Sequence, residues 1–209
     1  MIDARQALQR LRDGNERFAT NVRSLDNLLS QTQRGQLAGV RQEPFAIILG
    51  CSDSRAPAEM VFDQGLGDLF VIRVAGNIVA PSQVGSVEFA ATEFGTRLVV
   101  VLGHTQCGAI RATVDDLQHP GSHSDNIRSI VNRIRPAVED LVVADAGRGS
   151  AGLIEAATRA NVRASADHLR HGSAILEELI ARDSLLVVGA EYNLESGRVD
   201  FFDGVPGAS

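Results

Sequence analysis

Two short apolar runs constrain the fold of this chain more than any other feature. They cover residues 44–50 (PFAIILG) and 97–103 (RLVVVLG), and both are rich in the aliphatic residues of a buried strand. Cys51 follows the first run directly, and His104 and Cys107 follow the second. The chain has only two cysteines, so every thiol stands just after a predicted strand.

Further strands and helices alternate along the chain. The pattern predicts strands at 69–74, 185–190 and 198–202, and helices at 86–94, 108–117, 127–141, 151–170 and 175–182. The helices at 127–141 and 151–170 have mixed periodicity, so we expect them to lie on the surface. This order predicts an α/β fold with a central, mostly parallel β-sheet flanked by helices and an antiparallel C-terminal edge strand.

An N-terminal helical arm precedes this sheet. Asp3 is a suitable cap for a helix whose apolar residues Ala4, Leu8, Leu11 and Phe18 fall on one stripe. Residues 20–43 are polar, and we expect a short helical stretch within them. With 209 residues, the chain is predicted to be one domain over 1–209, with the arm at 1–43 and an α/β core at 44–209 that contains both cysteines.

Charge and composition exclude several kinds of partner. A net charge of −6 argues against nucleic acid, because a phosphate-binding face needs a basic surplus. No run reaches the eighteen or so apolar residues of a membrane-spanning helix. The first twenty residues lack the apolar centre of a signal peptide, which favours the cytoplasm. Two cysteines in that compartment are more often ligands or catalytic groups than a disulfide.

The reactive residues are predicted to gather at one rim of the sheet. Ligands of parallel sheets bind at the carboxyl ends of the strands, where Cys51, residues 75–77 and residues 104–107 all fall. Two Cys and one His, with a fourth position open or taken by Asp53, match a catalytic zinc. Asp53 and Arg55 alternate along the chain and are placed to form a bidentate pair.

Other interpretations of these residues stay open at this point. A cysteine after a strand is often a small buried apolar residue, and two thiols at one rim also suit a structural zinc or a redox pair. Structural zinc normally has four Cys or His ligands, and the chain has no Cys-x-x-Cys motif. A plain surface ion pair is the less favoured alternative for Asp53 and Arg55.

The two motifs resemble the zinc signatures of the β-class carbonic anhydrases. They are Cys51-Ser52-Asp53-Ser54-Arg55 and Gly103-His104-Thr105-Gln106-Cys107-Gly108, and the intervening segments around 62–77 and 85–90 are also similar to that family. The likeness spans roughly residues 3–202. It implies zinc-dependent reversible hydration of CO2 to bicarbonate and a proton, with Zn²⁺ held by Cys51, His104 and Cys107.

The resemblance also implies roles for the surrounding residues. Asp53, oriented by Arg55, would accept a hydrogen bond from the attacking hydroxide, or would bind the metal in a closed form of the site. The chain would form a homodimer or homotetramer with the active site at the subunit seam and the N-terminal helix packed on the neighbour. A plant-like substrate pocket would use Gln42, Phe70, Phe89 and the backbone at Gly108. Ile48 stands where members with a regulatory bicarbonate site usually carry Trp.

Two other functions remain compatible with the sequence. Relatives of this family hydrolyse carbonyl sulfide or carbon disulfide with the same zinc ligands, and no motif here excludes that activity. A non-catalytic zinc-binding oligomeric module is the other alternative. The Asp53–Arg55 pair argues against a purely structural role, because such a site has no use for a group that orients hydroxide.

Overall fold

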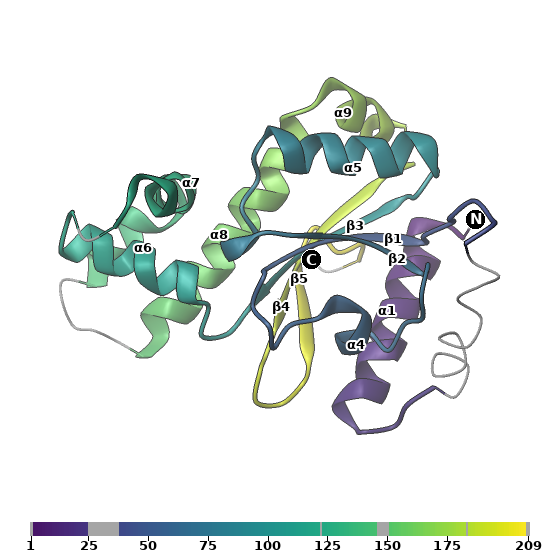
Figure 1. Cartoon of the computed structure of the whole chain (residues 1–209), viewed down its shortest axis with the longest axis horizontal. Helices are drawn as coiled ribbons and strands as arrows, with labels where there is room; N and C mark the ends of the chain where they lie inside the picture. The colour runs from purple at the N-terminus through teal and green to yellow at the C-terminus, as the bar shows by residue number, and fades with distance from the viewer. Residues whose placement is uncertain (1, 25–37, 122, 146–150, 183, 208–209) are drawn as a thin grey trace.

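The computed structural model describes residues 2–24, 38–121, 123–145, 151–182 and 184–207. Within these residues the chain forms a five-stranded sheet with the order β2-β1-β3-β4-β5 (Figure 1). The strands are β1 (Ala46–Gly50), β2 (Leu69–Arg73), β3 (Leu98–His104), β4 (Leu186–Tyr192) and β5 (Val199–Asp203). β1 to β4 pair in parallel, and β5 pairs antiparallel with β4 at the edge. The predicted fold class is confirmed.

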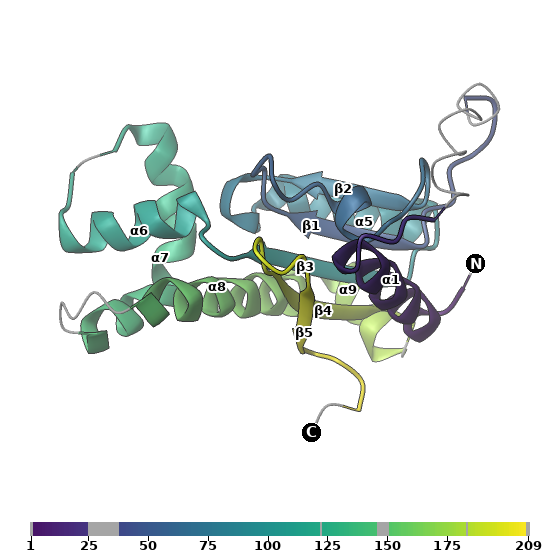
Figure 2. The same cartoon turned by 90° about the horizontal axis from the view of Figure 1, so that it is seen from below.

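Helices cover both faces of this sheet. They are α1 (Ala4–Ala19), α4 (Ala58–Val61), the 3₁₀ turn η1 (Ala75–Asn77), α5 (Pro81–Glu93), α6 (Gly108–Gln118), α7 (Asp125–Asp145), α8 (Ala151–His171) and α9 (Ala174–Ala181). α1 and α4 lie on one face, and α5 and α9 lie on the other (Figure 1). α6 and α7 project beyond the carboxyl ends of the strands, and α8 runs from them along the sheet (Figure 2).

The two central strands are buried along their whole length. All residues of β1 and β3 are buried, as expected for parallel strands covered on both faces. Ile48 and Val100 face the α1 side, whereas Ile47 and Val101 face the α5 and α8 side. This double burial explains why the two apolar runs lack the polar alternation of a one-sided sheet.

The N-terminal helix packs on its own chain. Asp3 caps α1 in a capping box with Gln6, which confirms the predicted start. Leu8 and Leu11 of the apolar stripe are buried in one cluster with the sheet, α4 and Phe62, and Ala4 and Phe18 are partly buried against that cluster. The expectation that this stripe docks on a neighbouring subunit is therefore wrong, because its own core covers it. Residues 25–37, which make up much of the 20–43 segment where a short helix is expected, lie outside the described residues.

Two other expectations are corrected by the structure. α8 was expected on the surface, but Val162, Ala166 and Leu169 are buried against the sheet. Its buried stripe includes small and polar residues, which weakened the apolar signal. α5 begins at Pro81 rather than at 86, because proline at the first turn suits a helix start. No helix in the described part of the chain has the length and apolar character needed to cross a membrane.

Candidate active site

Three neighbouring strands deliver the predicted site residues to one rim. Gly50, the last residue of β1, pairs with Arg73 of β2 and Leu102 of β3. Cys51, the turn η1 and the segment that starts at His104 therefore begin at the same level of the sheet. The prediction from strand ends is confirmed.

The three potential ligands converge on one point. The Sγ atoms of Cys51 and Cys107 and a ring nitrogen of His104 all lie within 4.8 Å of one another. The two Sγ atoms are 4.0 Å apart. Two thiolates on a tetrahedral zinc with Zn–S near 2.3 Å would be separated by about 3.8 Å. All three residues are buried, with exposed fractions of 7%, 1% and 1% for Cys51, His104 and Cys107.

His104 is oriented as a metal ligand would be. Its Nδ1 is 2.9 Å from the backbone oxygen of Thr105, so the Nδ1–H donates to that carbonyl. Its Nε2 is buried and has no hydrogen-bond partner among the described residues. A buried nitrogen with a free lone pair is costly unless something binds it. The donor set and this orphaned atom fit a bound metal ion.

The thiol pair has strongly perturbed protonation. The hydrogen bond from Cys107 lowers the pKa of Cys51, and the backbone N–H of Gly76, 3.4 Å from Cys51 Sγ, acts in the same direction. The same sulfur contact, together with burial, raises the pKa of Cys107. Burial opposes protonation of His104, but contact with Cys51 raises its pKa above the ordinary value. A thiolate and an imidazole that lie this close together are suitable ligands for a divalent cation.

Asp53 and Arg55 form the predicted bidentate pair. Arg55 donates from Nε to Oδ1 at 3.0 Å and from its terminal nitrogen to Oδ2 at 2.8 Å, and its backbone N–H donates to Oδ1 at 2.9 Å. The guanidinium holds the pKa of Asp53 well below its usual range. Oδ2 lies 3.9 Å from Nε2 of His104. The carboxylate thus faces the ligand cluster while it remains bound to arginine.

Sequence reasoning missed the residue that fixes this segment. Arg73, at the end of β2, donates from Nε to the carbonyl of Cys51 at 3.0 Å and from its terminal nitrogen to the carbonyl of Asp53 at 2.6 Å. It thereby holds the segment from Cys51 to Asp53 in place. Its place at a carboxyl strand end was the signal that could have identified it. On the other motif, Gln106 adopts φ of 58°, which turns the chain back between His104 and Cys107.

Known proteins are similar to this chain in sequence and in fold. The sequence profile of the carbonic anhydrase family matches residues 46–199. Carbonic anhydrase 2 of Mycobacterium tuberculosis is 37% identical over 195 residues, which cover 92% of this chain and 89% of that protein. This chain belongs to the β-carbonic anhydrase family. The enzyme therefore catalyses the reversible hydration of CO2, as a lyase.

Other similar proteins agree with this assignment. The carbonic anhydrase of Mycolicibacterium smegmatis is 37% identical over 199 residues, covering 93% of this chain and 91% of that protein. One of two tetrameric β-carbonic anhydrases solved from Sordaria macrospora superposes with a TM-score of 0.73 at 22% identity. That match covers 94% of this chain and 97% of the other, and it supports the fold.

The predicted substrate-pocket residues of the carbonic anhydrase do not all lie at the ligand cluster of one chain. Gly108 begins α6 directly after Cys107. Phe70 pairs with Ile47, four residues before Cys51, which at about 3.3 Å per residue is about 13 Å along the strand. Phe70 instead contacts Phe89, with ring centroids 6.5 Å apart. Gln42 is exposed ahead of the opposite end of β1.

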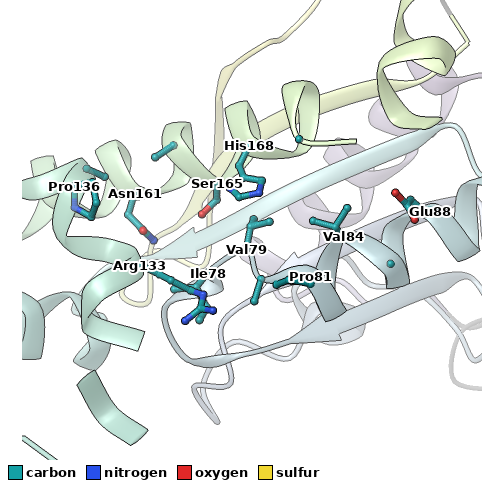
Figure 3. A pocket seen from close by; sticks show the side chains of 15 residues that line it. Ile78, Val79, Pro81, Val84, Glu88, Arg133, Pro136, Asn161, Ser165 and His168 are labelled. Atoms are coloured by element: carbon teal, nitrogen blue, oxygen red, sulfur yellow. The ribbon is translucent and has the colours of Figure 1, made fainter. Parts of the chain in front are cut away.

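A groove of about 780 Å³ lies beside the segment that follows the turn η1. It is bounded by α5, α7, α8 and the segment after η1, and the side chains of Asn161, Ser165 and His168 project into it from α8 (Figure 3). Neither cysteine nor His104 lines this groove. The groove and the ligand cluster are therefore separate features that share the turn between them.

Proposed function

We propose that the carbonic anhydrase holds one Zn²⁺ per chain on Cys51, His104 and Cys107 and uses Asp53 and Arg55 as its catalytic pair. The observation that supports this most is the convergence of three buried ligands beneath the arginine-bound carboxylate. Bound zinc lowers the pKa of a coordinated water to about 7 and so supplies a nucleophile near neutral pH.

The role of Asp53 follows from its hydrogen bonds. A carboxylate has about four acceptor positions, and Arg55 fills two on Oδ1 and one on Oδ2. The remaining acceptor position is therefore on Oδ2, the oxygen that faces His104. We assign to Oδ2 the acceptance of a hydrogen bond from the attacking oxygen, which directs a lone pair of that oxygen toward CO2. Arg55 keeps the acid ionised and fixes its direction.

One set of assays tests zinc and substrate together. CO2 hydration is measured by stopped flow, and the metal content is determined by elemental analysis. A chelator should remove the activity. Zinc should be the only metal in the purified protein whose content accounts for that activity. Full activity in protein free of zinc would contradict the metal assignment. Parallel assays with carbonyl sulfide and carbon disulfide test the alternative substrates, and CO2 should be turned over fastest.

We further propose that the enzyme is a homodimer or homotetramer that completes its substrate pocket across the seam. Phe89 is 51% exposed and forms one aromatic cluster with Phe70 and Phe94 beside β2. Phe70 and Phe94 are half-buried, and an exposed aromatic ring that extends such a cluster to the surface is typical of a protein interface. Because this cluster lies far from the ligands of its own chain, its contribution to a pocket would be made to a neighbouring subunit.

Sedimentation tests this assembly. The wild type should sediment as a dimer or tetramer of the 22.3 kDa chain, and Phe89→Asp should weaken the assembly and lower activity together. Met60→Asp is a matched control, because Met60 is also exposed, at 52%, but lies outside the aromatic cluster. A fully active monomer would contradict the proposal.

The subtype and location are inferred from the same features. Gln42, Phe70 and Phe89, with Ile48 in place of Trp, support the plant-like subtype and an open metal site. A reducing compartment such as the cytoplasm suits the enzyme, because Cys51 and Cys107 must stay reduced to bind a metal. Selective labelling of the two thiols in protein extracted without reductant tests this: both should be found unoxidised.

A further inference from the structure

The turn η1 is held from behind by two side chains of α8. Asn161 donates from its amide nitrogen to the carbonyl of Gly76 at 2.8 Å, and Ser165 donates from its hydroxyl to the carbonyl of Asn77 at 3.1 Å. Both donors are buried, with exposed fractions of 2% and 6%. Both point from α8 toward the segment that follows the turn (Figure 3).

The backbone conformation of this turn is unfavourable unless the surrounding residues stabilise it. Gly76 has φ of 71° and Asn77 has φ of 43°, so two consecutive residues are in the left-handed region. For Asn77 that region is uncommon and costs free energy unless the surroundings stabilise it. Gly76 is also enclosed, because a Cβ there would lie 2.8 Å from Ile134 and 3.0 Å from Ala109. The helices α6, α7 and α8 therefore fix the turn from several sides.

On the side away from α8, the turn contacts Cys51, one of the proposed metal ligands. The backbone N–H of Gly76 donates to Sγ of Cys51, which is the contact that the helices hold in place. Hydrogen bonds to a coordinating group orient it and tune its basicity. We propose that Asn161 and Ser165 are positioning residues for the Cys51 thiolate, acting through the backbone of Gly76 and Asn77. This proposal rests on the proposed metal site.

The substitution Asn161→Asp tests the idea with almost no change in shape. It replaces an amide donor by a carboxylate oxygen that repels the Gly76 carbonyl, so the turn should shift and the N–H···S contact should weaken. The zinc enzyme should then lose metal to a chelator about 10–100-fold faster. In the cobalt-substituted enzyme, the thiolate-to-cobalt charge-transfer band should move. Ser165→Ala should produce the same changes, at the lower end of that range.

Asn15→Asp is the matched control. Asn15 is also buried and donates from its amide to backbone carbonyls of Val61 and Gly197, but it does not touch η1. Its variant should lose stability to a similar degree and keep the wild-type metal-release rate and cobalt spectrum. This comparison separates positioning from general destabilisation.

The possible outcomes are distinct. If Asn161→Asp and Ser165→Ala release zinc at the wild-type rate with an unshifted cobalt band, the proposal is overturned. It is also overturned if Asn15→Asp changes both readouts equally. If Asn161→Asp does not fold, Ser165→Ala decides, because it removes only one hydroxyl. A wild-type enzyme that binds no zinc would instead contradict the metal assignment, which elemental analysis detects separately.

Discussion

Replacing Asp53 by asparagine should turn the hydrogen-bond acceptor that faces the proposed metal ligands into a hydrogen-bond donor. The arginine donates twice to Oδ1 and once to Oδ2 of Asp53. An asparagine places its NH2 group where it meets the fewest donors, which is the Oδ2 position. The group that faces His104 then becomes a hydrogen-bond donor. Asp53→Asn should therefore be at least as inactive as Asp53→Ala, even though asparagine is closer to aspartate in shape.

The expected loss of activity has a definite scale. A positioned side chain that handles a proton in the transition state contributes about 10²–10⁴-fold, which corresponds to about 2.7–5.4 kcal/mol in the barrier. Both variants should lose this much in kcat/KM for CO2 hydration, measured by stopped flow with a pH indicator. Zinc content should stay at the wild-type level, because the proposed ligands are untouched.

Asp203→Asn provides the control for this experiment. Asp203 accepts from Arg170 at 2.7 Å and is 19% exposed at the side chain, close to the 17% of Asp53. It lies on the edge strand β5, so its variant should keep wild-type turnover. The reasoning fails if Asp53→Asn retains more than about a tenth of the wild-type kcat/KM with zinc bound, since even the low end of the range is 10²-fold.

Three further outcomes are expected. Cys51→Ser should purify with much less zinc than the wild type, and stoichiometric zinc at unchanged affinity would remove Cys51 from the ligand set. A zinc-loaded wild-type crystal above pH 8 should show Asp53 still paired with Arg55, whereas Arg55→Ala should let the carboxylate turn onto the metal. Because Arg55 lowers the pKa of Asp53, the ionised pair should persist as the pH falls through the usual carboxyl range. Leu11→Ala should lower the free energy of unfolding by about 2–5 kcal/mol, measured by urea denaturation at fixed protein concentration, because Leu11 is fully buried; a loss below 1 kcal/mol would mean that α1 does not pack on its own sheet.

The central sheet could be predicted because its signals are local. Apart from Arg97, the runs before Cys51 and His104 are apolar, and residue type alone distinguishes them from the amphipathic segments around them. Once both strands are parallel neighbours, the rule that parallel strands end at one rim brings the ligands together without further information. Asp53 and Arg55 could be paired from the sequence as well, because they are only two positions apart and alternate residues of an extended segment share a face.

The helices were harder to predict because tertiary packing decides them. The predicted helix at 127–141 already passed through Pro136, but α7 runs from Asp125 to Asp145, two residues earlier and four residues later, although proline removes a backbone donor inside the helix. Val131, Ile134 and Val138 are buried on either side of that proline, and this burial outweighs the local penalty. The docking of α1 likewise depends on Phe62, which is distant in sequence. The apolar stripe alone therefore could not show whether α1 packs on its own core or on a neighbouring subunit.

For the polar residues of α8, a single sequence cannot predict the hydrogen-bond partners. Asn161 and Ser165 are four residues apart and share a buried stripe with Val162, Ala166 and Leu169. A polar residue inside such a stripe must find a partner, because a buried donor without one is destabilising. The sequence thus implies that partners exist. Their identity requires the fold, since the two carbonyls lie 85 and 88 residues away. The carbonyl groups belong to a turn with an uncommon conformation, and this turn contacts Cys51, a proposed metal ligand. The first measurable effect of losing Asn161 or Ser165 should therefore be a change in metal binding.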